Sequence, residues 1–192
     1  METEIVVRSF DETLDLASIQ EIWKSGLSQT FENSNIFTRW LGGFMFGIMA
    51  LHACGPWGDL GGNVVFWKQP RRNLFVAVKK APVGENGGKE EILGCVACKE
   101  GQNISDCDPA SKDASIFRLS VAEFARGQGV ASLLMDAAEQ FAREQGALQI
   151  FAVTGNPKAA RLYLKRGFSE DGSTWKLKKP LFTDETPGSG QS

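Results

Sequence analysis

Residues 126–131, Arg-Gly-Gln-Gly-Val-Ala, constrain the fold of this chain most, because two glycines stand there between an apolar run and an amphipathic helix. The apolar run, residues 116–121, predicts a strand. After the glycines, apolar residues recur at the three-and-four spacing of a helix with one buried face. The expected buried positions are Val130, Leu133, Leu134, Ala137, Ala138, Phe141 and Ala142. The expected outer positions are Ser132, Asp136, Glu139, Gln140, Arg143 and Glu144.

Two glycines at a strand-to-helix junction let the backbone approach a ligand closely. The first turn of a helix adds unpaired N–H groups and the positive end of the helix dipole, which together suit a phosphate or pyrophosphate. The stretch lacks the lysine of a P-loop, and Ser132 stands where a dinucleotide fingerprint needs its third glycine. It fits the pattern [QR]-x-x-G-x-[GA] through Arg126, Gly129 and Ala131. A plain glycine turn is the alternative.

Residues 154–168 form a second informative stretch. Asn156 followed by Pro157 predicts a helix start, with asparagine as the N-cap and proline at the first helical position. Gly167 predicts its end. Tyr163, the only tyrosine in the chain, follows Asn156 by seven residues, so two helical turns place both on one face. On the helix alone, Tyr163 fits a catalytic role and a core anchor equally well.

The two stretches together resemble the GNAT superfamily of N-acetyltransferases. The second one carries the pattern N-x-x-A-x-x-x-Y-x-x-x-G-F, and its Asn156 lies 27 residues after Gly129. The resemblance implies an α/β fold in which a mixed, largely antiparallel sheet is flanked by helices on both faces. It implies transfer of an acetyl group from acetyl-CoA to a primary amine by direct attack. The chain also resembles the membrane-associated branch that acetylates cysteine conjugates.

The resemblance also implies a role for individual residues. Backbone N–H groups of the glycine stretch would hold the pyrophosphate, and the preceding strand would pair with the pantetheine amides. A backbone N–H near Val121 would face the thioester oxyanion. Asn156 would contact the cofactor, and Tyr163 would be the general acid for the departing thiolate. The expected cofactor-binding residues are Leu119, Ser120, Val121, Arg126, Gly127, Gln128, Gly129, Val130, Ala131, Ser132 and Asn156.

No residue stands out as the base that takes the proton of the amine. Glu123 follows the motif strand, and Glu32 lies in an early helical region that would flank the acceptor. His52, the only histidine, sits in an apolar run where a structural role is the ordinary interpretation. Water can relay the proton instead, because holding the amine against the thioester supplies much of the rate.

Composition and cysteine placement limit the alternatives. A length of 192 residues suits one domain, which we expect over residues 1–182, followed by a disordered tail over 183–192. The net charge of −2 gives no support for nucleic-acid binding. Cys95 and Cys98 fall on an expected strand, where residues three apart point to opposite faces, so we expect no metal site. Reduced thiols and an acidic N-terminus favour a cytoplasmic protein.

Residues 41–58 form an apolar insertion whose role the sequence leaves open. Its apolar part, residues 41–54 with His52 as the one interruption, is 14 residues long, short of the roughly 20 of a spanning helix. A buried helix lining the acceptor pocket, an anchor at a membrane surface and a spanning helix all remain. The alternative function is a CoA-binding or membrane-associated interaction module without turnover. The amine acceptor cannot be identified from the sequence.

Overall fold

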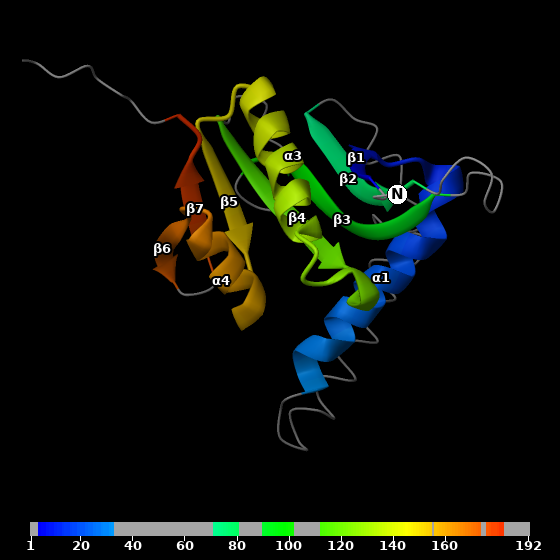
Figure 1. The fold of residues 1–192 in the computed structure, drawn as a ribbon. Coiled ribbons are helices and arrows are strands. Elements are labelled where there is room, and N and C mark those ends of the chain that lie inside the picture. Colours follow the sequence, from blue (N-terminus) through cyan, green and yellow to red (C-terminus); the bar gives the residue numbers. More distant parts are fainter. Residues whose placement is uncertain are drawn as a thin grey trace, which may run out of the picture.

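The computed structural model describes residues 4–32, 71–80, 90–101, 112–154, 156–173 and 176–182. The described elements, shown in Figure 1, are β1 (Ile5–Ser9), α1 (Glu12–Glu32), β2 (Arg72–Lys79), β3 (Glu91–Glu100), β4 (Asp113–Val121), a 3-10 turn (Glu123–Ala125), α3 (Val130–Glu144), β5 (Gln149–Val153), α4 (Pro157–Lys165), β6 (Ser169–Ser173) and β7 (Lys176–Pro180). The apolar insertion 41–58 and the expected tail 183–192 lie outside the described residues. Within the described part, no helix has both the length and the hydropathy needed to cross a bilayer.

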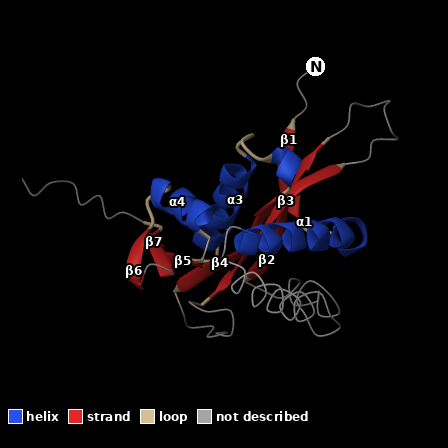
Figure 2. Cartoon of the chain, turned by 90° about the horizontal axis from the view of Figure 1, so that it is seen from below, coloured by secondary structure: helices blue, strands red, loops and turns tan. Residues whose placement is uncertain are grey.

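The seven strands form one sheet in the order β1-β2-β3-β4-β5-β7-β6. Every neighbouring pair is antiparallel except β4 and β5, which are parallel because α3 crosses over between them. Helix α1 covers one face of the sheet, and α3 and α4 lie on the other (Figure 2). The expected fold class, a mixed and largely antiparallel sheet with helices on both faces, is confirmed.

Alternating side chains of β3 feed two cores, one on each face of the sheet. Cys95 belongs to the core cluster that includes Trp23 of α1, whereas Cys98 belongs to the cluster that includes Leu134 of α3 and Tyr163 of α4. The two thiols therefore point to opposite faces, as the strand spacing predicted. Among the described residues, no group of three or more His, Cys, Asp or Glu side chains is placed to hold a metal ion.

For the region of α1, the sequence predicts a helix that starts after Asp11 as its N-cap and runs to about Leu27, and a second helix that starts near Gln29 or Asn33. The Asp11 carboxylate accepts the N–H of Thr13 at 2.9 Å, which makes Asp11 the N-cap. The helix continues past Leu27 without interruption to Glu32, so no second helix starts at Gln29, while Asn33 lies outside the described residues. At its first turn, the buried Asp15 forms a bidentate ion pair with Arg8 of β1 at 2.7 and 2.8 Å, which ties the helix to the sheet edge.

Helix α3 departs from its expected amphipathic pattern at two positions. Leu133, expected in the core, is 40% exposed, while Glu139, expected on the outer face, is only 3% exposed. Three cations surround the Glu139 carboxylate: Lys179 of β7 at 2.8 Å, Arg166 at 3.2 Å and Arg143 at 3.5 Å. A buried carboxylate needs such partners, and this one joins α3, the end of α4 and β7.

The two buried thiols make stability depend on alkaline pH. Burial raises the pKa of both Cys95 and Cys98 to about 12, whereas an unfolded cysteine has a pKa of about 8.5. Above pH 8.5 the unfolded chain releases thiol protons that the folded chain keeps, so the free energy of unfolding falls as pH rises.

We expect a loss of about 1.4 kcal/mol per thiol for each pH unit between 8.5 and 12. Urea unfolding under reducing conditions at pH 8 and pH 10 measures this loss, and the Cys98→Ala variant should lose about half as much from thiol ionisation. An identical pH dependence in the two proteins would contradict burial of the Cys98 thiol.

Candidate active site

Strand β4 changes its pairing along its length, and this opens the sheet. Residues 113–116 of β4 pair in parallel with residues 149–152 of β5. Farther along, the described residues of β4 pair only with β3, while Val153 at the end of β5 pairs with Lys176 of β7. The two parallel strands therefore diverge, and the end of β4 opens on the β5 side, where residues 119–121 have no strand partner among the described residues.

A β-bulge at Arg118 shapes this open half of β4. Three steps along β4, from Phe117 to Ser120, match only two steps along β3. Arg118 has a φ of 59°, in the left-handed region that costs a residue with a side chain about 1–2 kcal/mol. Its guanidinium lies 4.4 Å from the centroid of the Trp23 ring, and the Cys95 thiol donates a weak hydrogen bond to its carbonyl at 3.5 Å. The bulge is thus held from α1 and from β3.

The glycine turn after β4 presents unpaired N–H groups at the start of α3. Gly127 and Gly129 have φ of 78° and 79°, and a Cβ added to either would meet no atom within 4 Å. Within the described part of the chain, the N–H groups of residues 127–131 have no hydrogen-bond partner, whereas the N–H of Ser132 donates to the Gly129 carbonyl at 2.9 Å. Together with the helix dipole, this turn suits an anion.

Helix α4 begins as the sequence predicts. The side chain of Asn156 caps it by accepting the N–H of Lys158 at 2.9 Å, and Pro157 occupies its first position. The N–H of Asn156 in turn donates to the Thr154 hydroxyl at 3.1 Å. The side-chain oxygen of Asn156 accepts the capping hydrogen bond. The side-chain NH2 group of Asn156 can therefore donate to a ligand.

Tyr163 is both a core residue and a pocket residue. It is 3% exposed, and its ring centroid lies 5.3 Å from that of Phe168. Tyr163 also lines the main pocket between the diverging strands. Removal from water raises its pKa well above the ordinary value, because burial disfavours the charged phenolate. The hydroxyl therefore stays protonated at neutral and mildly alkaline pH, as a hydrogen-bond donor must.

The main pocket, with a volume of about 490 Å³, lies along the open half of β4. It brings together seven of the residues expected from the sequence: Leu119, Ser120, Val121, Arg126, Ala131, Asn156 and Tyr163. The other five do not line it with side chains: Gly127, Gln128, Gly129, Val130 and Ser132. The side chain of Val130 is buried in the core. The glycine turn can therefore contact a ligand in the pocket only through its backbone or through exposed side chains.

Sequence reasoning missed several pocket residues. The further lining residues are Trp23, Gly26, Phe117, Arg118, Val153, Thr154, Lys158, Ala159 and Leu162. The stretch after β5 and the first turn of α4 are adjacent to Asn156 in the sequence, so Thr154 and Lys158 had a local signal. Trp23 and Gly26 had no such local signal, because α1 is far from the two motifs in the sequence and is brought to the pocket by the tertiary fold.

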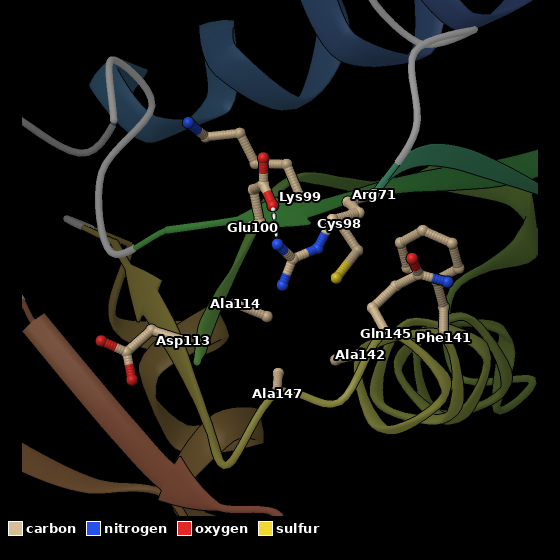
Figure 3. A pocket seen from close by; sticks show the side chains of 10 residues that line it. All are labelled: Arg71, Cys98, Lys99, Glu100, Asp113, Ala114, Phe141, Ala142, Gln145 and Ala147. Atoms are coloured by element: carbon tan, nitrogen blue, oxygen red, sulfur yellow. Dashed lines mark ion pairs between the residues drawn. The ribbon is translucent and has the colours of Figure 1, made fainter. Parts of the chain in front are cut away.

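A second cavity, at the opposite end of β4, has a volume of only about 10 Å³. It lies among the ends of β3, β4 and α3, where Arg71 and Glu100 form an ion pair at 2.8 Å (Figure 3). A space of this size accommodates about one water molecule. The larger pocket is therefore the candidate active site.

Comparison with known proteins connects this geometry to one family. The model of the Acetyltransferase (GNAT) family matches residues 45–168. N-acetyltransferase 8 of Mus musculus is 37% identical over 95 residues, which make up 48% of this chain and 40% of the mouse protein. The match thus spans about two fifths of the length of that relative.

Two solved structures share the fold. The PaiA N-acetyltransferase of Thermoplasma acidophilum, in complex with coenzyme A, superposes with a TM-score of 0.61 at 16% identity, over 92% of this chain and 99% of that one. YncA of Salmonella typhimurium, solved with acetyl-CoA, gives a TM-score of 0.54 at 17% identity, over 98% of this chain and all of that one (100%).

The end of β4 depends on a close approach of β3, and a substitution at Gly94 tests this. A Cβ on Gly94 would lie 2.6 Å from the Ser120 carbonyl oxygen, so Gly94→Ala forces the two strands apart. We expect a loss of about 1–3 kcal/mol in the free energy of unfolding by urea.

The control is Gly26→Ala in α1, where the new Cβ would meet the Ser120 hydroxyl at an ordinary 3.6 Å. That variant should be as stable as the wild type or more stable, since alanine favours helix over glycine. Equal stability of Gly94→Ala and wild type would contradict the tight strand contact.

Proposed function

Because the chain belongs to the GNAT acetyltransferase family, we propose that it transfers the acetyl group of acetyl-CoA to a primary amine by direct attack. In this reaction the amine nitrogen forms a bond to the acetyl carbon, the C–S bond of the thioester breaks, and the amine loses a proton while the thiolate gains one. The observation that carries the proposal is one pocket that is lined by the end of β4, by Arg126 and Ala131 on either side of the glycine turn, and by Tyr163.

The residues present fit the cofactor along its length. The unpaired N–H groups of residues 127–131 suit its pyrophosphate, and Arg126 and Lys158 line the pocket with two cations for its phosphates. The backbone of residues 119–121, on the side that faces β5, can pair with the pantetheine amides as an added strand would. An N–H near Val121 is proposed as the donor to the thioester oxyanion.

Tyr163 is proposed as the general acid. A free thiol has a pKa of about 8.5, so protonation helps the thiolate depart without being essential. The raised pKa keeps Tyr163 protonated before the reaction and makes it a weak acid, so its hydroxyl is proposed to stabilise the departing thiolate first as a hydrogen-bond donor. Phe168 packs on the ring and fixes its position.

The proton of the amine is proposed to leave through water. Glu123 is exposed and does not line the pocket, and none of the described lining residues is acidic. The side chain of Glu32 and all of His52 lie outside the described residues. A neutral amine held against the thioester reacts without a strong base, because proximity supplies much of the rate.

The domain bounds 1–182 and contact of residues 41–58 with a membrane remain predictions. The alternative function is a module that binds CoA, or associates with a membrane, without turnover. Release of CoA thiol that depends on an added amine distinguishes the enzyme from the module.

A charge change at the glycine turn tests the cofactor site. Gly129→Asp and Gly129→Asn are nearly isosteric, and both residues tolerate a left-handed backbone, so they differ mainly in charge. We expect calorimetry to show acetyl-CoA binding about 10- to 100-fold weaker for Gly129→Asp than for Gly129→Asn, because a carboxylate repels the pyrophosphate. Equal affinities of the two variants for acetyl-CoA, or no binding of acetyl-CoA by folded wild type, would contradict the proposed cofactor site.

Tyr163→Phe tests the acid role, since it removes the hydroxyl and keeps the ring that packs on Phe168. The kcat for acetyl transfer should fall about 10- to 100-fold, while the Kd for acetyl-CoA stays unchanged. Because its pKa is raised, Tyr163 should produce no fall in rate below pH 10. A kcat equal to that of the wild type at every pH would remove the acid role.

A further inference from the structure

A buried carboxylate outside the main pocket is connected to the segment that holds Tyr163. Glu139 of α3 is 3% exposed and does not line that pocket. Its carboxylate pairs with Arg166, directly after α4, at 3.2 Å, and with Lys179 of β7 at 2.8 Å. Arg166 begins the turn that ends α4, residues 166–168, so Glu139 is tied to this turn.

The turn of residues 166–168 is bonded directly to Tyr163. The backbone N–H groups of Arg166 and Phe168 both donate to the Tyr163 carbonyl, at 3.0 and 3.1 Å. The Phe168 ring packs on the Tyr163 ring, with 5.3 Å between the centroids. The Lys179 ammonium that pairs with Glu139 also lies 5.9 Å from the Phe168 centroid, within the range of a cation–π contact. A shift of this turn would therefore move both the backbone and the ring of Tyr163.

Helix α4 depends on such an anchor because it is short. It has nine residues, and helices shorter than about 12 residues are marginal in water without tertiary packing. Asn156 caps its start, whereas Arg166 ties its end to α3. The Arg166 guanidinium bonds both Glu139 and Asp136, which lie three residues apart on α3. An arginine that engages two carboxylates at once fixes direction as well as distance.

We propose that Glu139 is a positioning residue for catalysis: through Arg166 and the turn of residues 166–168, it holds the Tyr163 hydroxyl in the orientation that proton donation requires. The inference rests on the proposed function, in which Tyr163 is the general acid. A misplacement of a reacting group by about 1 Å can reduce a rate by about 100-fold. Buried ion pairs contribute little net stability, so fixing an orientation is the role that such a cluster fits better.

The kinetic test compares Glu139→Gln, which keeps the size of the side chain and removes its charge, with Arg143→Gln. Arg143 pairs with the same carboxylate at 3.5 Å and donates to the Leu181 carbonyl, beyond β7, at 3.3 Å. The control therefore perturbs the same carboxylate from the side of β7. We expect Glu139→Gln to lower kcat about 10-fold while the Kd for acetyl-CoA stays unchanged, and Arg143→Gln to keep the kcat of the wild type.

Asp136→Asn is a second, milder variant of the same tether. The Asp136 side chain is 62% exposed, so the change leaves no buried charge without its partner and the protein should fold. Because Arg166 loses one of its two carboxylates, we expect kcat to fall by about 2- to 5-fold. A kcat equal to that of the wild type in both Asp136→Asn and Glu139→Gln would overturn the inference.

A double variant separates positioning from a general effect on the enzyme. In a Tyr163→Phe background there is no acid hydroxyl left to position, so adding Glu139→Gln should leave the kcat of Tyr163→Phe unchanged. A further loss of about 10-fold in the double variant would overturn the inference, because additive effects indicate independent causes.

The absorbance of the phenolate gives a readout that does not need activity. Tyr163 is the only tyrosine in the chain, so its ionisation can be followed by itself. Burial raises the pKa of Tyr163. If Glu139→Gln loosens the turn, the hydroxyl meets water and should ionise at lower pH than in the wild type and Arg143→Gln. Circular dichroism at each pH restricts the comparison to folded protein.

The outcomes separate this inference from the proposed function. The same titration and the same kcat in folded Glu139→Gln as in the wild type would overturn the role of Glu139 and leave acetyl transfer standing. Binding of acetyl-CoA by the wild type without acetylation of any amine would contradict the proposed function, and this inference with it, even where the titration shifts.

Discussion

The structure depends on one strand having two partners in succession. The first half of β4 needs β5 to complete the sheet, and the second half must leave β5 to create a pocket. The bulge at Arg118 makes the change, because an extra residue turns the strand and interrupts its ladder. Its backbone strain of about 1–2 kcal/mol is small beside the pairing with β3 on both sides of it. Strand β4 can therefore separate from β5 at this point while it stays paired with β3.

The same bulge directs neighbouring side chains of β4 to opposite faces of the sheet. Leu119 and Val121 pack toward the core beneath α3, while Arg118 stacks on Trp23 of α1. The glycine turn then starts α3, and within the described part of the chain the N–H groups of residues 127–131 have no partner. One continuous segment, from β4 through the turn, thus provides both one side of the pocket and the N–H groups at the start of α3.

Sequence reasoning succeeded where the signal was local. The glycines of the turn and the Asn156-Pro157 helix start are read from neighbouring residues, and the structure gives both the expected backbone. Sequence reasoning failed where contacts with a distant segment determine whether a side chain is buried or how the backbone bends. Glu139 looks like a surface residue on a helical wheel, yet Lys179 and Arg166 make its burial favourable. The bulge at Arg118 has no local marker either, since arginine is not a residue that favours positive φ.

A structural role for Tyr163 is compatible with the chemical role that is proposed for it. Its packing on Phe168 and its low exposure are those of a core anchor, which was one interpretation of the sequence. The same removal from water raises its pKa, so the hydroxyl remains a donor where an exposed phenol would begin to ionise near pH 10. Its edge lines the pocket while its ring holds α4 to the sheet. The burial that stabilises the helix is therefore what would keep the proposed acid protonated.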